Sequence, residues 1–221
     1  MKTLVTGASS PLGKRICEFL NKKGYQVIVT AHNTPIEEAY KTIKTDLTSA
    51  SGVQALCENL VNEKSLDLLV NCFGPLLVKP LLETTQQELI SQYQATFFTP
   101  YSLMQKLYPL LEKKGGSIIN LGLCGLNHSK VSTYYPVYKS AKHSLLYLTK
   151  CFAKELIEKN VRVNMISPGY LEHSIDLPKS DLPQKRLVQL EEILSAIDFL
   201  LDTKNLSITG QNIEIAGGVG L

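Results

Sequence analysis

Short apolar runs, rich in β-branched residues, recur along the chain, and segments with helical spacing separate most of them. Buried strands that alternate with helices are typical of a parallel sheet covered on both faces. We therefore predict an α/β fold with a doubly wound (Rossmann) parallel sheet of seven strands. The seven expected strands are "TLVT", "QVIVT", "KTIKT", "LDLLV", "SIINL", "VRVNMI" and "NIEIA".

The segments between these runs predict five helices. Thr85 with Glu88 has the pattern of a capping box at the start of the longest helix, which Pro100 and Pro109 should kink or interrupt. No linker, internal repeat or low-complexity tract divides the sequence, so residues 1–221 are expected to form a single domain. The expected helices cover roughly residues 12–23, 49–63, 86–113, 139–159 and 188–202.

Composition and charge argue against several classes of function. Apolar residues make up 44% and charged residues 19%, as in ordinary globular proteins. A net charge of +3 is too weak to favour nucleic acid or an anionic membrane as a partner. We see no signal-peptide pattern and no apolar run near the ~18 residues of a membrane helix. Five cysteines without a CxxC pair indicate reduced thiols in the cytoplasm, and the four histidines lack the spacing of metal ligands.

A glycine-rich turn, "LVTGASSPLGKRI", lies between the first expected strand and the first expected helix. Gly7 lets the chain turn tightly, and Gly13 should let the helix pack close to the sheet. Ser10 is the expected N-cap, with Pro11 at the first helical position. The free N–H groups and the dipole of this helix start favour a cofactor phosphate. The alternative is a purely structural turn between strand and helix.

The second expected strand ends in "VIVTAHNT" without a carboxylate. An NAD site usually places Asp or Glu there to bind the ribose 2′-hydroxyl. His32 and Asn33 would not repel a 2′-phosphate, and Lys14, Arg15 and His32 can favour one. This pattern predicts NADP(H) over NAD as the cofactor, unless His32 and Asn33 are simply solvated loop residues.

Several further short motifs occur one after another along essentially the whole chain. They are "TGASSPLG", with Pro11 in place of a middle glycine, "DL" at residues 46–47, "NCFG" at 71–74, "YKSAK" at 138–142, "SPGYLEHS", and "ITGQNIEIAGG", with Ala216 in place of an aspartate. Taken together, the chain resembles the short-chain dehydrogenase/reductase family, as a divergent member of its classical type. The resemblance implies a set of cofactor-binding residues: Gly7, Ser9, Ser10, Leu12, Gly13, His32, Asn33, Asp46, Leu47, Asn71, Gly74, Tyr138, Lys142, Pro168, Gly169 and Leu171.

Tyr138 and Lys142 are the expected catalytic pair. A helix brings residues four apart onto one face. Free tyrosine has a pKa near ~10, and a nearby ammonium would lower it toward a value useful for proton transfer. The resemblance implies that Tyr138 is the general acid/base and that Lys142 assists it and holds the nicotinamide ribose. The alternative is a core tyrosine with a helical lysine neighbour.

Two further departures from the family pattern matter for the expected chemistry. The family serine that helps to hold the substrate carbonyl aligns with Leu123, which cannot donate a hydrogen bond. Loss of one such donor costs about 10²–10³ in rate. The family asparagine of the fourth helix aligns with Gln94, which we take as the third catalytic residue. Polar residues between 127 and 135 offer replacement donors, and some relatives without the serine, the pteridine reductases, loosely resemble this chain.

These observations predict an NADPH-dependent oxidoreductase that reduces a small carbonyl or pterin-type substrate. The alternative is a non-catalytic NADP(H)-binding sensor or scaffold from the same family, for which the departures at Leu123 and Gln94 count. The resemblance also implies a homodimer or homotetramer that pairs the fourth and fifth helices. Apolar contacts at that interface are expected from Phe97, Phe98, Tyr101, Leu146 and Phe152.

Overall fold

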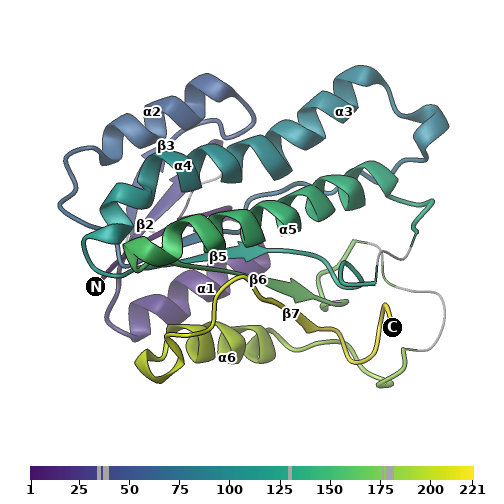
Figure 1. Ribbon diagram of the computed structural model, residues 1–221. Helices are drawn as coiled ribbons and strands as arrows, with labels where there is room; N and C mark the ends of the chain where they lie inside the picture. The colour runs from purple at the N-terminus through teal and green to yellow at the C-terminus, as the bar shows by residue number, and fades with distance from the viewer. Residues whose placement is uncertain (34–35, 37–39, 129–130, 176, 178–181) are drawn as a thin grey trace.

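The seven predicted strands form one sheet in which every neighbouring pair runs parallel (Figure 1). The computed structural model describes residues 1–33, 36, 40–128, 131–175, 177 and 182–221. The strand order is β3-β2-β1-β4-β5-β6-β7, which confirms the predicted doubly wound fold. The strands are β1 (Lys2–Thr6), β2 (Gln26–Ala31), β3 (Lys41–Lys44), β4 (Leu68–Asn71), β5 (Ser117–Leu121), β6 (Arg162–Pro168) and β7 (Asn212–Ile215).

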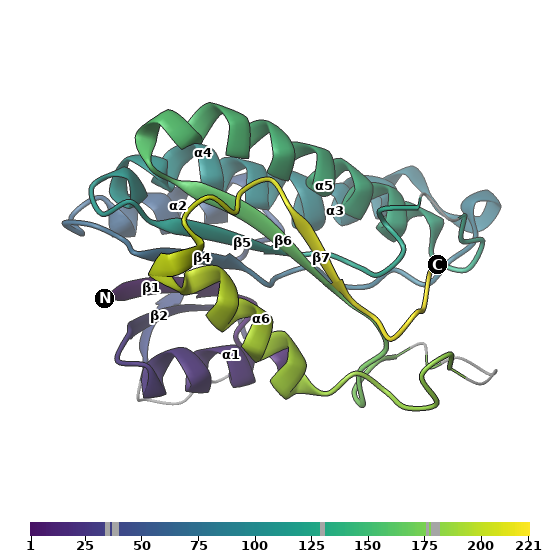
Figure 2. The same ribbon diagram turned by 60° about the horizontal axis from the view of Figure 1, so that its bottom comes forward.

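Helices cover both faces of the sheet, as Figures 1 and 2 show together. Helices α1 and α6 pack on one face, and α2, α4 and α5 pack on the other. Each face buries its own apolar cluster, one around Leu4, Leu69 and Ile118 and the other around Val5, Val70 and Ile119. The helices are α1 (Pro11–Lys22), α2 (Ala50–Leu60), α3 (Gln86–Tyr93), α4 (Thr99–Glu112), α5 (Pro136–Leu156) and α6 (Leu190–Leu201).

The long helix expected over residues 86–113 is interrupted, as its prolines predicted. Helix α3 passes into a π-helical segment, η2 (Gln94–Phe98), before α4 begins. Pro100 lies in the first turn of α4 and cannot donate a backbone hydrogen bond, whereas Pro109 is accommodated within α4. The capping box is confirmed, because Glu88 N donates to Thr85 Oγ1 (3.2 Å) and Thr85 N donates to Glu88 Oε2 (2.8 Å).

Helices α1 and α2 begin in the same way. The N-cap Ser10 of α1 accepts a hydrogen bond from Gly13 N, and the N-cap Ser49 of α2 accepts one from Gly52 N, both at 3.0 Å. Each serine hydroxyl also donates to the carbonyl oxygen three residues earlier, that of Gly7 or Asp46. Both helix starts are therefore fixed to the loops that precede them.

The order of the strands reverses between β1 and β4, which are neighbours although β2 and β3 separate them in the sequence. In open sheets of this kind, ligands bind beyond the carboxyl ends of the strands at such a reversal. Within the described part of the chain, no helix is both long and apolar enough to cross a membrane. The same residues contain no group of three or more His, Cys, Asp or Glu side chains arranged to hold a metal.

Candidate cofactor and active site

The turn between β1 and α1 is built around two glycines that a side chain would not fit. Gly7 has φ = +69°, and a Cβ there would lie 2.8 Å from the Cα of Phe73. A Cβ on Gly13 would lie 2.2 Å from the carbonyl oxygen of Gly7. Gly13 therefore brings the start of the helix close to the turn that directly follows β1. The two glycines leave an open backbone cradle at the start of α1.

The other predicted residues of this turn lie around the same helix start. Ser10 is the N-cap and Pro11 the first residue of α1, as expected. Ser9 is exposed, whereas Leu12 is partly buried against the core on the α1 side of the sheet. The Sγ atom of Cys72, beyond β4, lies 4.0 Å from Ser10 Oγ. The start of α1 therefore faces the carboxyl ends of β1 and β4, where a phosphate would meet its free N–H groups.

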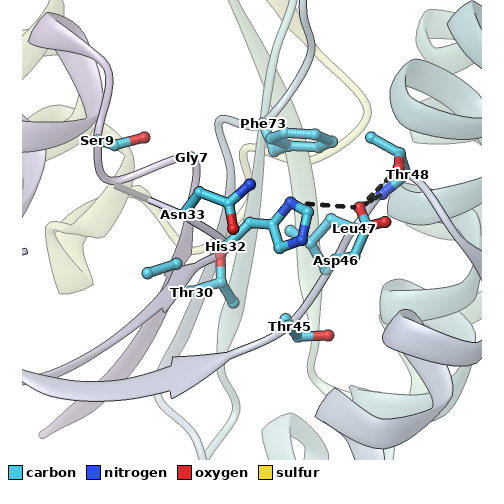
Figure 3. Close-up of a pocket in the computed structure, with 11 residues that line it drawn as sticks. Gly7, Ser9, Thr30, His32, Asn33, Thr45, Asp46, Leu47, Thr48 and Phe73 are labelled. Carbon is cyan, nitrogen blue, oxygen red and sulfur yellow. Dashed lines mark hydrogen bonds and ion pairs between the residues drawn. The ribbon is translucent and has the colours of Figure 1, made fainter. Parts of the chain in front are cut away.

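A cavity of about 280 Å³ lies beside this turn (Figure 3). The carboxyl ends of four neighbouring strands and the segments that follow them form its walls. The predicted residues Gly7, Ser9, His32, Asn33, Asp46 and Leu47 all line it. Ala31, which precedes His32, also lines it. The other lining residues were not among the predicted cofactor-binding residues, although each lies at or near a strand end: Thr30, Thr45, Thr48 and Phe73.

Among the described residues that line this cavity, His32 and Asp46 are the ionisable ones. The Nδ1 atom of His32 lies 4.0 Å from Asp46 Oδ1, as Figure 3 shows. Hydrogen bonds from the Thr48 hydroxyl and backbone N–H, helped by the charge of His32, lower the pKa of Asp46. Arg15 does not line the cavity, because its guanidinium pairs with Glu18 (2.6 Å) and Glu191 (2.8 Å). Of Lys14, Arg15 and His32, which the sequence offered as groups for a 2′-phosphate, His32 is the one among the described lining residues.

Tyr138 and Lys142 lie on one face of α5, as their spacing predicted. Lys142 Nζ donates a hydrogen bond to the carbonyl oxygen of Leu121, at the end of β5 (2.6 Å). The same nitrogen lies 5.5 Å from the centroid of the Tyr138 ring. Burial lowers the pKa of Lys142 to about 8, an effect that the nearby Cys72 partly opposes. The arrangement places a buried ammonium beside a partly exposed phenol at the carboxyl end of the sheet.

Gly74, which follows β4, is bordered by the side chains of Lys142 and of Thr96 in the π-helical segment η2. A Cβ on Gly74 would lie 3.4 Å from Lys142 Nζ and 3.6 Å from Thr96 Oγ1. Thr96 is fully buried and accepts a hydrogen bond from Gln92 (2.6 Å). Thr96 is therefore the η2 side chain that borders Gly74 together with Lys142. Gln94 lies two residues earlier and is only partly buried.

Asn71 is the last residue of β4 and begins a buried series of side-chain hydrogen bonds. Its Nδ2 donates to Asn120 Oδ1 on β5 (2.8 Å), and Asn120 Nδ2 donates to Thr149 Oγ1 on α5 (2.9 Å). The Oδ1 atom of Asn71 is buried and has no hydrogen-bond partner among the residues that the structure describes. This series ties α5, which carries Tyr138 and Lys142, to the two central strands.

The predicted residues Pro168, Gly169 and Leu171 lie at and after the carboxyl end of β6. Pro168 ends β6, and Gly169 N donates to Ile215 O on β7 (2.8 Å). A Cβ on Gly169 would lie 2.8 Å from the Cα of Ala216, so the two segments pack backbone to backbone. Leu171 forms an isolated parallel bridge with Val188.

Leu123 follows β5 and packs, partly buried, against the core beneath α4 and α5. Its side chain supplies no hydrogen-bond donor at the carboxyl end of β5, where the sequence analysis expected one to be needed. The next part of the loop is held by its backbone, since Cys124 N donates to Pro168 O (3.1 Å).

Comparisons with known proteins agree with this geometry. A family model described as enoyl-(acyl carrier protein) reductase matches residues 7–220. The 3-oxoacyl-(acyl-carrier-protein) reductase FabG of Vibrio cholerae is 30% identical over 240 residues, which cover 98% of this chain and 96% of the relative. Carbonyl reductase family member 4 of Xenopus laevis is 27% identical over 232 residues, covering 98% and 97%.

Solved structures match over the same length. The RhlG/NADP active-site complex of Pseudomonas aeruginosa has a TM-score of 0.87 and 26% identity, covering 100% of this chain and 96% of that one. A 4-hydroxyisoleucine dehydrogenase complexed with NADH has a TM-score of 0.88 and 26% identity, covering 98% and 97%. The chain belongs to the short-chain dehydrogenase/reductase family.

Proposed function

We propose that this chain is an NADP(H)-dependent oxidoreductase that reduces a small carbonyl or pterin-type substrate. One observation carries the proposal: the buried Lys142 ammonium lies 5.5 Å from the ring centroid of Tyr138, at the carboxyl end of the sheet. Such a charge favours the phenolate and so adapts Tyr138 to proton transfer near neutral pH. The 221 residues would act as one catalytic unit.

In the proposed reaction the protein binds the carbonyl next to Tyr138 and supplies the proton. When bound, the cofactor supplies a hydride. Tyr138 gives its hydroxyl proton to the carbonyl oxygen, and Lys142 stabilises the phenolate that remains. Because Lys142 Nζ already donates to Leu121 O, the ammonium is held in place before substrate arrives.

The backbone around Gly7 and Gly13 suits a dinucleotide. A Cβ at either position would close the cradle at the start of α1, and Ser10 fixes that helix start. The adjoining cavity of about 280 Å³ suits the adenosine half. No carboxylate ends β2, where NAD sites usually carry one, and His32 lies in its place. NADP is also the cofactor in the active-site complex of the related RhlG.

The first test is Tyr138→Phe, which removes only the hydroxyl. We expect turnover of small carbonyls to fall by at least about 10². The NADPH-induced rise in melting temperature should persist, because the variant keeps the ring and Lys142. A fully active Tyr138→Phe protein would remove Tyr138 from the proposed mechanism.

A second test addresses the cofactor through the thermal melting of the purified protein with NADPH and with NADH. A ligand at ~100 times its Kd adds about 2.7 kcal/mol to the free energy of unfolding. For a chain of this length that corresponds to about 5–10 °C. We expect this shift with NADPH and a much smaller one with NADH. An equal or larger shift with NADH would contradict the argument from the missing carboxylate.

A second candidate function is a non-catalytic NADP(H)-binding sensor or scaffold. Leu123 favours it, because this residue leaves the end of β5 without a hydrogen-bond donor. The two candidates differ in one result. A protein that binds NADPH with the expected thermal shift but reduces no carbonyl would support the sensor, whereas turnover that depends on Tyr138 would support the enzyme.

The outer face of α4 and α5 is the proposed site of self-association into a homodimer or homotetramer. A cavity of about 320 Å³ opens there, with Tyr101, Leu148 and Phe152 among its lining residues. Phe98 is 47% exposed, whereas Leu146 is 7% exposed and belongs to the core. Leu146 is therefore removed from the predicted interface.

A cytoplasmic location and the loose likeness to pteridine reductases also remain proposals.

A further inference from the structure

Reduction of a carbonyl places developing negative charge on its oxygen. Hydrogen-bond donors held in place before the reaction stabilise this charge more than mobile ones. If the proposed function is right, Tyr138 supplies one donor. Leu123, at the end of β5, supplies none. A second donor has to come from another part of the site, and the loop that joins β5 to α5 is the segment next to Tyr138.

This loop is anchored at its start by the last strand of the sheet. The carboxylate of Glu214 on β7 accepts hydrogen bonds from the backbone N–H groups of Gly125 (3.1 Å) and Asn127 (3.0 Å). Asn212, also on β7, donates to Asn127 Oδ1 (3.0 Å). The Asn127 side chain is therefore held at the β7 edge.

The end of the loop is anchored where α5 begins. The Ser132 hydroxyl oxygen accepts from the backbone N–H groups of Tyr134 (3.3 Å) and Tyr135 (3.4 Å). Tyr135 is the N-cap residue of α5, and its carbonyl oxygen accepts from Lys139 N (3.0 Å). Its backbone is thus fixed from both sides, three residues before Tyr138.

The ring of Tyr135 packs against the ring of Tyr138. Their centroids are 6.3 Å apart and their planes meet at 81°, an edge-to-face contact. Both side chains are partly exposed, so each is open to a ligand. Tyr134 is 57% exposed, and the aromatic contact found for its ring is with Tyr135, not Tyr138. Among the described loop side chains, Tyr135 is thus the one in ring contact with the proposed acid.

We propose that Tyr135 is a second catalytic residue, whose hydroxyl donates a hydrogen bond to the substrate carbonyl oxygen. In the reaction, bound NADPH would supply the hydride that forms the new C–H bond at the carbonyl carbon, and would itself be oxidised. The C=O π pair moves to the oxygen, which takes the proton of Tyr138 and becomes a hydroxyl. Tyr135 keeps its own proton and only stabilises the charge on the oxygen.

The test compares Tyr135→Phe with Tyr134→Phe, a matched loss of one hydroxyl at the neighbouring position. NADPH oxidation is followed with diacetyl, ethyl acetoacetate and nitrobenzaldehyde as carbonyl probes. We expect Tyr135→Phe to lower kcat by about 10²-fold, as for the loss of one oxyanion donor. NADPH-induced thermal stabilisation should not change, and Tyr134→Phe should turn over like the wild type.

A rescue variant separates a lost hydrogen bond from a disturbed loop. Adding Leu123→Ser to Tyr135→Phe places a hydroxyl at the end of β5, and we expect part of the lost kcat to return. Equal rates for Tyr135→Phe and wild type would overturn the role of Tyr135 while leaving Tyr138 in place. So would an equal loss in Tyr134→Phe. A wild-type protein that binds NADPH and reduces none of the probes would overturn this proposal and the enzymatic one together.

Discussion

Lys142 is the single residue whose charge most directly controls the proposed chemistry. Burial disfavours its ammonium and lowers its pKa from 10.5 to about 8. Below this value the residue is charged, and in the proposed mechanism that charge favours the phenolate of Tyr138. As pH rises above it, the charge and its effect on the phenol are lost. The proton donor of a carbonyl reduction therefore weakens on the alkaline side.

The pKa shift of Lys142 also predicts a pH dependence of stability. Between about pH 8 and pH 10.5 the unfolded chain keeps the Lys142 proton and the folded chain loses it. Because the unfolded state then binds more protons, this group makes the free energy of unfolding rise with pH over that interval. Lys142→Met removes the effect. We expect any stability advantage of Lys142→Met at neutral pH to shrink as pH rises, measured by urea unfolding. A difference that is constant with pH would contradict the shift.

For single residues, the sequence was enough to predict neighbours that follow from the regular geometry of an α-helix. The four-residue spacing of Tyr138 and Lys142 was enough to place both on one face of α5. The residue near Lys142 on the preceding helix was not predictable in the same way, because η2 is π-helical and shifts the register that a regular α-helix would give. The η2 side chain that borders Gly74 together with Lys142 is that of Thr96, and the catalytic role expected for Gln94 stays a prediction. The printed sequence contains only Pro100 as a local sign of this irregularity.

The starts of α1 and α2 allow an effect of mutation on stability to be distinguished from an effect on cofactor binding. Helices α1 and α2 share the same N-cap geometry, with Ser10 and Ser49 each bonded to a glycine N–H three residues later. Only the start of α1 faces the proposed diphosphate. The two serines therefore form a matched pair for experiment.

Replacing either N-cap serine by alanine should cost about 1 kcal/mol of stability. We expect similar losses for Ser10→Ala and Ser49→Ala in denaturant unfolding without cofactor. Only Ser10→Ala should also weaken NADPH binding, measured by titration calorimetry. Equal NADPH affinities in the two variants would argue against a phosphate at the start of α1.

Elements with strong local signals were predicted well. All seven strands, the capping box at Thr85 and the N-cap at Ser10 follow from patterns a few residues long. At Gly13, the close approach expected from the sequence is to the carbonyl of Gly7, in the turn that follows β1. A sequence pattern indicates that a close approach is needed, but not which atom is approached.

Self-association belongs to the scale of the whole molecule. Phe98 lies in η2, directly before α4, on the face proposed to pair with a second copy. Phe98→Asp would place a charge in such an interface, where burial without a partner is costly. We expect the mass measured by light scattering to fall toward that of a single chain. Val61→Asp is the control. Val61 is the C-cap residue of α2 and is 72% exposed, so this variant should leave the mass unchanged. A wild-type protein that is already monomeric would contradict the proposed interface.

Long-range contacts set the limit of prediction for the molecule as a whole. Alternating strands and helices were enough for the doubly wound sheet. The contacts of Glu214 with the loop after β5 join residues 89 and 87 positions apart, and no local pattern marks them. The same holds for the pairing of Arg15 with Glu191, which removes Arg15 from the cofactor cavity. Such partners depend on the completed sheet.

The central place of β1 has a consequence for how the chain is made. One edge of β1 pairs with β2, which follows soon after it, but the other edge pairs with β4, in the register Thr3 with Leu68. During synthesis that second edge stays open until β4 has left the ribosome, and an open apolar edge favours aggregation. Parallel sheets closed by distant partners also fold slowly. Yield in the cell should therefore depend on synthesis rate and chaperone supply more than on the stability of the finished protein.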